Sequence, residues 1–380
     1  MKKIGHEVLF LHTGEKNPRN GEGTFARLKD GSILFAYTDY CGDSGEDHGV
    51  ARISGCVSPD EGETWSAPRV LLTKDEGDQN IMSASLLRMA NGDLGIVYLR
   101  KQVMPDTGII CMPVFRRSSD EGQTWSDWIC CVPEEGYYCT INDGVTQLPD
   151  GRILVPMSCH GLRYDAFGTC TLDLGEPAGG TLQIACSSDD GATWEILSPR
   201  LVSPYKDTVG LGEPGVYGYK NGDLWLYCRT GYGHQYQSFS RDGGKTWSSP
   251  TPNFGFTSPD CPMRVRRVGQ YTAAVFNPQP YTCLRTDSEV WRSPRRTPLV
   301  CTLSRDDGHS FSDKIRLSVN GGLDDFTASC YLLEDDQNES YCYPAIFPVE
   351  DGFLVAYYHS DGTPYCLRST KISKVRYDEF

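Results

Sequence analysis

Residues 58–65 read Ser-Pro-Asp-Glu-Gly-Glu-Thr-Trp, and the pattern Ser-x-Asp-x-Gly-x-Thr-Trp recurs at 118–125, 187–194 and 240–247. A fifth copy, at 304–311, ends in Ser-Phe. In such an Asp box, the Asp can accept backbone N–H bonds across a turn, the Gly supplies a positive φ, and the Trp covers the turn. The copies start 60, 69, 53 and 64 residues apart, enough for a four-stranded sheet with its loops. We therefore expect each Asp box to be a structural hairpin turn, remote from any active site.

A second pattern alternates with the first along the chain. In it, a turn with Asp-Gly or Asn-Gly leads directly into a short apolar strand. It occurs at 29–36, 91–97, 149–155, 221–226 and 350–356, with a weaker copy at 268–275. No amphipathic helical pattern longer than about two turns is present. The sequence thus predicts an all-β fold, a six-bladed β-propeller of four-stranded antiparallel blades. Strands at 4–11 and 365–375 can complete one shared blade and close the ring.

Composition limits the possible partners and compartment. The chain has 380 residues, a net charge of -14 and no linker-like segment, so we expect one domain over residues 1–380. The acidity argues against nucleic acid or a membrane as partner, although a few converging arginines could still bind a small anion. No signal peptide or long apolar segment is visible, and the 16 cysteines lack zinc-binding spacing. We expect a cytoplasmic protein without a metal site; the oligomeric state stays unknown.

Five Asp boxes on six turn-strand units resemble the sialidase (neuraminidase) superfamily, and the resemblance extends over nearly the whole chain. It implies a propeller domain with a cleft on its axis and an exo-glycoside hydrolase that needs no cofactor. The implied substrate is an acidic glycan or oligosaccharide, from which a terminal sialic acid or related sugar is released. Sialidases use a Tyr nucleophile. A neutral phenol avoids the repulsion that a carboxylate nucleophile would meet from the carboxylate of the sugar.

The resemblance assigns the nucleophile and its base by their distance from the turns. The family Tyr lies eight residues before the Asp-Gly turn of the last blade, and Tyr343 has that spacing from Asp351. Tyr341 is the close competitor. The activating Glu of the family precedes a turn-strand unit that ends in Arg and is followed by an Asp box. Glu213, the turn at 221–222 and Arg229 reproduce this order.

The family acid/base Asp lies on a loop between the first inner strand and the first Asp box. Here that loop, residues 38–49, offers several carboxylates. Asp47 has about the family spacing, and the neighbouring His-Gly would let the loop lean over the cleft. The alternatives are Asp43, Glu46 and Asp39.

The resemblance also implies three arginines that bind the substrate carboxylate, a task suited to the bidentate guanidinium. Arg229 is one, and Arg296, eight residues before the Ser of the last Asp box, is another, with Arg295 as its alternative. Arg19 matches the first-blade position of the third. The remaining binding candidates are Glu22, which could orient Arg19, and two residues ahead of the 149–155 turn, Asn142 and Asp143.

Three departures from the family pattern leave the sugar open. Pro344 follows the candidate nucleophile where the family usually has Ser. Residues 18–23 read Pro-Arg-Asn-Gly-Glu-Gly where the family has Arg-Ile-Pro, and residues 356–359 read Ala-Tyr-Tyr-His where many sialidases carry a Glu. Alternative hypotheses are a non-catalytic carbohydrate-binding propeller, or a propeller glycosidase or lyase that acts on another acidic sugar.

Overall fold

The computed structural model of the chain describes residues 1–104, 108–164, 170–173, 179–205, 210–279, 296–311, 330–361 and 367–380. Within these ranges the regular elements are β-strands, apart from a short 3-10 helix at Tyr377–Glu379. None of the described segments forms a helix long and apolar enough to cross a membrane.

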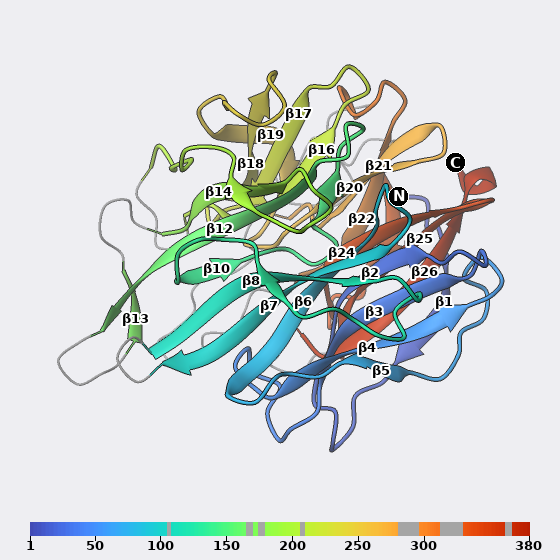
Figure 1. Cartoon of the computed structure of the whole chain (residues 1–380). Coiled ribbons are helices and arrows are strands. Elements are labelled where there is room, and N and C mark those ends of the chain that lie inside the picture. Colours follow the sequence, from blue (N-terminus) through green and yellow to red (C-terminus); the bar gives the residue numbers. More distant parts are fainter. Residues whose placement is uncertain are drawn as a thin grey trace, which may run out of the picture.

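The strands form six four-stranded antiparallel blades around a common axis (Figure 1), as the two repeating patterns predict. The first blade consists of β2 (Asn20–Arg27), β3 (Ile33–Tyr40), β4 (Ala51–Ser58) and β5 (Arg69–Leu72), and the second of β6 (Asp78–Arg88), β7 (Leu94–Met104), β8 (Gly108–Ser118) and β9 (Ile129–Cys130). The third consists of β11 (Thr146–Gln147), β12 (Ile153–Tyr164), β14 (Thr181–Ser187) and β15 (Glu195–Ile196), and the fourth of β16 (Gly212–Gly218), β17 (Leu224–Arg229), β18 (His234–Ser240) and β19 (Thr251–Thr257). The fifth consists of β20 (Arg264–Val268), β21 (Tyr271–Phe276), β22 (Leu299–Ser304) and β23 (Cys330–Glu334), and the sixth of β24 (Ser340–Val349), β25 (Gly352–Ser360), β26 (Ser369–Arg376) and β1 (His6–Leu11).

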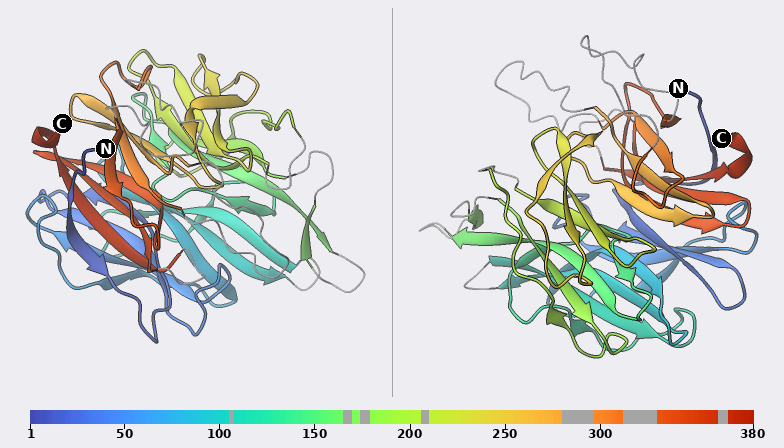
Figure 2. Two further views of the ribbon diagram at one scale, coloured as in Figure 1. Left: turned by 180° about the vertical axis from the view of Figure 1, so that it is seen from behind. Right: turned by 90° about the horizontal axis from the view of Figure 1, so that it is seen from above.

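The two ends of the chain close the ring. Strand β1 pairs antiparallel with β26, so the first strand of the chain completes the last blade. The N- and C-termini accordingly lie close together in every view (Figures 1 and 2). Closure pairs the edge strands that an open ring of blades would expose.

The second and third blades are joined by a strand that the repeats did not predict. Strand β10 (Tyr137–Cys139) pairs antiparallel with β12 and makes a parallel bridge to β8 at Cys111. Strand β13 (Cys170–Asp173) pairs antiparallel with residues 161–164 of β12 and forms a further hairpin there. These two blades therefore form one continuous hydrogen-bonded sheet.

The Asp boxes are the turns that the sequence predicts, and each joins the third and fourth strands of a blade. In the first, the Ser58 hydroxyl accepts a bond from the N–H of Gly62 at 2.8 Å, and the Asp60 carboxylate accepts bonds from the N–H and hydroxyl of Thr64. The same bonds recur in the other four boxes. The first box also contacts the neighbouring blade, because Glu61 accepts a bond from the backbone N–H of Glu350.

Most of the core lies between neighbouring blades. One apolar cluster joins the first two blades and contains Leu34, Ile53 and Leu86, all less than 5% exposed. Another joins the first and last blades through Phe35 and Leu354. Each blade thus buries both faces, which explains why the second and third strands of the blades read as nearly continuous apolar runs.

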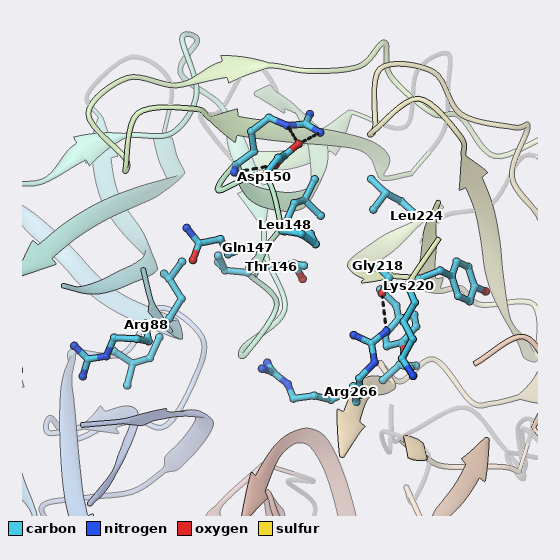
Figure 3. Close-up of a pocket in the computed structure, with 18 of the residues that line it drawn as sticks. Arg88, Thr146, Gln147, Leu148, Asp150, Gly218, Lys220, Leu224 and Arg266 are labelled. Carbon is cyan, nitrogen blue, oxygen red and sulfur yellow. Dashed lines mark hydrogen bonds and ion pairs between the residues drawn. The ribbon is translucent and has the colours of Figure 1, made fainter. Parts of the chain in front are cut away.

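The innermost strands of all six blades run in the same direction along the axis. Where they begin, they bring the predicted site residues together. Where they end, near the Asp-box turns, they surround a separate cavity (Figure 3).

Candidate active site

A recurring β-bulge shapes the cleft end of the propeller. Four innermost strands shift register, three of them close to their start and β6 at its middle, and a residue with positive φ stands within each shift. A fifth such residue precedes β11. The five residues are Glu22, Ser83, Asp143, Glu213 and Tyr343, with φ between 43° and 55°. A bulge re-aims a side chain, and non-Gly residues at positive φ are concentrated at functional sites. Three of the five are candidate catalytic or orienting residues.

The neighbours of these residues allow the chain to make the bulge. Gly21 and Gly23 flank Glu22, and a Cβ on Gly21 would lie 2.0 Å from the ring of Tyr358. Pro214 and Pro344 follow Glu213 and Tyr343 in the same relative position. Pro344, the departure from the family Ser, is thus part of a backbone arrangement that the chain uses twice.

Tyr343, Glu213 and Arg229 form one contact group. The hydroxyl of Tyr343 donates to Oε1 of Glu213 at 2.6 Å. Arg229 lies against both, with its Nη1 3.1 Å from the Tyr343 oxygen and 2.8 Å from Oε2 of Glu213. The order of Glu213 and Arg229 in the sequence therefore corresponds to a real contact, made across strands β16 and β17.

Burial and charge both act on this group. Burial raises the pKa of Tyr343 well above that of a free phenol, and Glu213 adds to the increase while Arg229 opposes it. Burial also raises the pKa of Glu213, against the opposing effects of Arg229 and the Tyr343 hydrogen bond. A neutral phenol beside a carboxylate of raised basicity is the pairing in which the phenol can transfer its proton as it attacks.

Arg229 and Arg296 converge on Asp260, which the sequence analysis did not single out. Nε of Arg229 lies 3.0 Å from Oδ1 of Asp260, and Nη2 of Arg296 donates to the Asp260 backbone oxygen at 3.0 Å. The guanidinium of Arg296 lies 5.6 Å from the ring centroid of Tyr343. Two of the three predicted arginines thus lie beside the candidate nucleophile; the alternative Arg295 lies outside the described residues.

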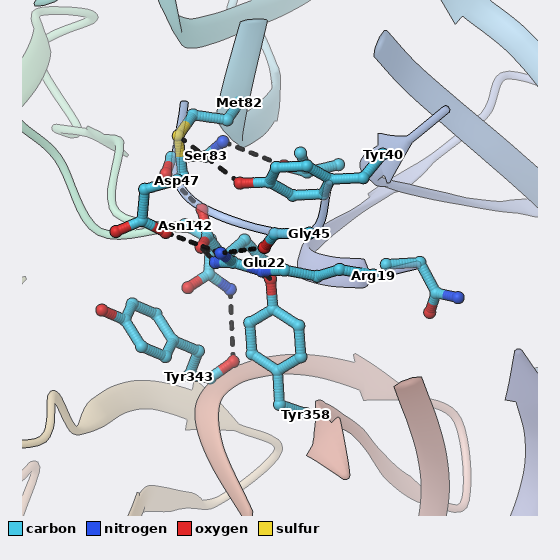
Figure 4. A network of polar contacts seen from close by, with 12 residues as sticks. Arg19, Glu22, Tyr40, Gly45, Asp47, Met82, Ser83, Asn142, Tyr343 and Tyr358 are labelled. Atoms are coloured by element: carbon cyan, nitrogen blue, oxygen red, sulfur yellow. Dashed lines mark hydrogen bonds and ion pairs between the residues drawn. The ribbon is translucent and has the colours of Figure 1, made fainter. Parts of the chain in front are cut away.

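Arg19 lies near Tyr343 in a second polar network (Figure 4). Its side chain is 3% exposed and is paired with Glu22 at 2.7 Å and Asp47 at 2.6 Å. Nε of Arg19 donates to the hydroxyl of Tyr358 at 2.8 Å. Glu22 also accepts a hydrogen bond from Ser83. Glu22 and Tyr358 together orient Arg19, and Tyr358 does so from the part of the last blade where many sialidases carry a Glu.

Among the loop carboxylates, Asp47 is the one paired with Arg19. Its side chain is 61% exposed, while its backbone oxygen accepts a bond from the buried Lys101 at 2.7 Å. Desolvation acts to raise the pKa of Asp47, but the positive charges of Arg19 and Lys101 prevail and lower it to about 2. Of the alternatives, Asp39 is buried against Arg52, and Asp43 and Glu46 are exposed.

The remaining candidates lie outside these two groups or beneath them. Tyr341 is 1% exposed in the apolar core and hydrogen-bonded to Glu339, away from Glu213. Asn142 is fully buried and donates to the backbone oxygen of Tyr343 at 3.4 Å. The carboxylate of Asp143 pairs with Arg264 and Arg266, two arginines that line the cavity at the opposite end of the axis.

The sequence analysis missed several residues of the cleft: Ser83, Lys101, Asp260 and Tyr358. Each owes its place to a contact between blades, so spacing from the nearest turn could not identify it. The bulge does leave a weak trace, since the polar Ser83 lies between Met82 and Ala84 at the middle of β6. Within the described ranges, no group of three or more His, Cys, Asp or Glu side chains is arranged to hold a metal ion.

Comparisons with known proteins agree with this architecture. Residues 17–356 match the family described as BNR repeat-like domain. No curated protein matches the chain. A protein of unknown function from Dyadobacter fermentans DSM 18053 superimposes with a TM-score of 0.72 at 18% identity, with 98% of this chain and 99% of the other covered.

Two trans-sialidase structures are similar at lower identity. The leech intramolecular trans-sialidase, bound to 2,7-anhydro-Neu5Ac, has a TM-score of 0.70 at 13% identity, with 100% of this chain and 71% of the other covered. The Ruminococcus gnavus intramolecular trans-sialidase, bound to oseltamivir carboxylate, has a TM-score of 0.67 at 14% identity, with 99% and 98% covered. At such identities the likeness establishes the fold, whereas the chemistry depends on the cleft residues.

Proposed function

This chain belongs to the BNR repeat-like domain family, and on that premise we propose that it is an exo-acting, retaining glycoside hydrolase of the sialidase type. Its substrate is a glycan that ends in an acidic sugar, sialic acid or a related one. The observation that carries the proposal is the 2.6 Å hydrogen bond from Tyr343 to Glu213, with Arg229 in contact with both.

In the first step, the Tyr343 oxygen attacks the anomeric carbon while its proton passes to Oε1 of Glu213. The bond to the leaving sugar breaks, and the leaving oxygen takes a proton from the acid/base group, Asp47. In the second step, Asp47 removes a proton from water, which attacks the anomeric carbon. Tyr343 then leaves and recovers its proton from Glu213. Arg229 stabilises the negative charge that develops on the phenol oxygen in each step.

The arginines account for the preference for an acidic sugar. Arg229 and Arg296 lie beside Tyr343, and Arg19 belongs to the polar network that Figure 4 shows near the same residue. Guanidinium groups gathered near the nucleophile can hold a carboxylate attached to the anomeric carbon. The fixed contacts of Arg19 with Glu22 and of Arg229 with Asp260 keep these donors oriented before substrate binds.

A panel of aryl glycosides, including sialosides and uronides, tests the proposal. The parent protein should hydrolyse at least one acidic glycoside with retention of configuration. Tyr343→Phe should lower turnover by at least about a thousandfold, because the nucleophile is lost. Tyr341→Phe is the matched control, since this neighbouring Tyr belongs to the core, and it should keep near-parental turnover. Equal rates for Tyr343→Phe and the parent would reject the assignment.

A second candidate is a carbohydrate-binding propeller without turnover. One observation favours it: Arg19 and Lys101 hold the candidate acid, Asp47, in its ionised form, with a pKa of about 2. An acid in that state has no proton to donate to a leaving group. Binding of an acidic sugar without hydrolysis of any glycoside in the panel would select this candidate.

A further inference from the structure

The second cavity of the propeller lies on the axis, at the end opposite the cleft (Figure 3). All six blades contribute to it through their innermost strands or the residues next to them, from Phe25 in the first blade to Phe347 in the last. Its volume is about 880 Å³. Cavities of roughly 300–1,000 Å³ are typical of sites for small molecules.

The lining of this cavity is rich in positive charge, although the chain as a whole carries a net charge of -14. Seven lining residues are cationic: Arg27, Arg88, Arg152, Lys220, Arg264, Arg266 and Arg267. Five carboxylates pair with them, those of Glu61, Glu121, Asp143, Asp150 and Asp307. The cations therefore outnumber the carboxylates that neutralise them, and a local excess of positive charge attracts anions into a concave site.

Part of the excess arises where two arginines share one carboxylate. Oδ2 of Asp143 lies 3.2 Å from Nε of Arg264 and 2.9 Å from Nη2 of Arg266. Asp143 and Arg264 are each 2% exposed, whereas the side chain of Arg266 is 29% exposed. The Nε of Arg266 has no hydrogen-bond partner among the described residues. That Nε is itself buried, but the exposed part of the side chain places the incompletely paired guanidinium of Arg266 at the wall of the cavity.

Lys220 supplies the rest of the excess. It follows β16 at the edge of the cavity, is exposed, and makes no ion pair with any residue that the structure describes. Figure 3 shows Lys220 beside Gly218 and Arg266 below them, with Leu148 and Leu224 on the wall above. Charged donors thus stand beside an apolar surface, a combination that suits a ligand with one anionic end and an uncharged body.

From this arrangement we propose that the cavity at the Asp-box end of the axis is a binding site for a small organic anion. The carboxylate, phosphate or sulfate group of the ligand binds Arg266 and Lys220, and its uncharged body packs on Leu148 and Leu224. The site is separate from the cleft and does not depend on the reaction carried out there. Burial lowers the pKa of Arg266, against the effect of Asp143, so a second anion beside this guanidinium would favour its charged form.

Calorimetric titration at constant ionic strength tests the site with three probes: inorganic phosphate, inorganic sulfate and benzoate. The three probes separate the anionic groups from one another, and benzoate adds an apolar body. Arg266→Gln should weaken binding of the best probe by about tenfold, the loss of one charge-assisted contact, and Lys220→Gln by about threefold. Arg266→Gln leaves Asp143 paired with Arg264, so we expect this variant to fold. Lys220 is exposed, so Lys220→Gln still tests the site if Arg266→Gln does not fold.

Two further variants distinguish this site from other anion binding. Lys245→Gln removes the same charge from an exposed lysine outside the cavity and should leave the affinity unchanged. Arg229→Gln, in the cleft, can change only binding in the cleft, and should leave unchanged the affinity that Arg266→Gln and Lys220→Gln weaken. If Arg229→Gln abolishes binding while Arg266→Gln and Lys220→Gln bind like the parent, the probe occupies the cleft and the proposal is wrong. It is equally wrong if none of the three probes binds.

Discussion

The carboxylate of Asp47 lies 2.6 Å from Nη1 of Arg19, so the candidate acid/base and a candidate substrate-binding arginine neutralise each other. A substrate carboxylate that binds Arg19 must share this guanidinium with Asp47 or displace it. Displacement would remove the main positive charge that lowers the pKa of Asp47, and would bring its pKa back towards the range in which it can donate a proton. Substrate binding and the protonation of Asp47 are therefore linked through Arg19.

Asp47→Ala tests this linkage. Removal of the competing carboxylate should strengthen binding of a non-hydrolysed carboxylate sugar several-fold, while turnover falls by about a hundredfold for want of the acid/base group. The affinity is measured by titration calorimetry and the turnover with an aryl glycoside. Asp43→Ala, an exposed position on the same loop, is the control. Weaker ligand binding in Asp47→Ala would show that Asp47 does not compete for Arg19.

The pH dependence of turnover should depend on Glu213. This residue must be ionised to accept the Tyr343 proton, and burial raises its pKa above the ordinary value for Glu. Turnover should therefore rise with pH on the acid side through a midpoint above that ordinary value. Glu213→Gln should lose most of the turnover, and the remaining turnover should no longer fall on the acid side of the pH profile. Glu195→Gln, at an exposed position on β15, should keep the pH profile of the parent. An unchanged acid limb in Glu213→Gln would assign it to another group.

Glu22 should matter more for stability than Tyr358, although both orient Arg19. Glu22→Gln removes one partner of a buried ion pair and should lower the free energy of unfolding by about 2–3 kcal/mol. Tyr358→Phe removes the hydroxyl that accepts from Arg19 and donates to Glu22 at 3.4 Å, but no charge, and should cost about 1 kcal/mol. Urea denaturation measures both, with Glu350→Gln at an exposed turn as the reference. A larger loss for Tyr358→Phe would mean that the hydrogen bonds of the phenol, rather than the charge of Glu22, dominate.

The Asp boxes should make the fold sensitive to acid. Hydrogen bonds from Thr124, and further bonds including one from Ser118, lower the pKa of Asp120 to about 2 in the folded protein. The carboxylate therefore stabilises the fold at neutral pH, and this contribution is lost as the pH falls from about 4 towards 2.

Asp120→Asn should consequently show a smaller drop in melting temperature between pH 5 and pH 2.5 than the parent. Asp127→Asn is the control, because its exposed carboxylate makes no hydrogen bond to a described residue. If the two variants lost equal stability over this pH range, the hydrogen bonds of the box would not be the source of the acid sensitivity.

The local turns made most of the architecture predictable. The Asp box uses bonds among residues two to four positions apart, so its residue types alone specify it. The Asp-Gly and Asn-Gly turns are local in the same sense. Strand β10 was not predictable, because its parallel bridge to β8 depends on how two blades meet.

The cleft residues likewise include some that local spacing predicted and some that it did not. Spacing from the turns placed Glu213, Arg229 and Tyr343 in the blades where they are found, and the structure brings these three into contact. Spacing could not identify Tyr358, which reaches Arg19 from the last blade, or Asp260, which reaches Arg229 from the connection between β19 and β20. It also named Asp143 as a binding residue, although the carboxylate faces Arg264 and Arg266 instead.

By itself, the sequence determined the blades, their number and the order of the polar residues along each innermost strand, because a turn and the period of a strand are local properties of the chain. Only the tertiary structure decided which of those residues meet. Closure of the ring aligns bulges from separate blades, so that the Tyr343 hydroxyl reaches Glu213 although the two residues are 130 positions apart. Closure also turns Asp143 away from the cleft and leaves Arg266 and Lys220 at a second, positively charged cavity.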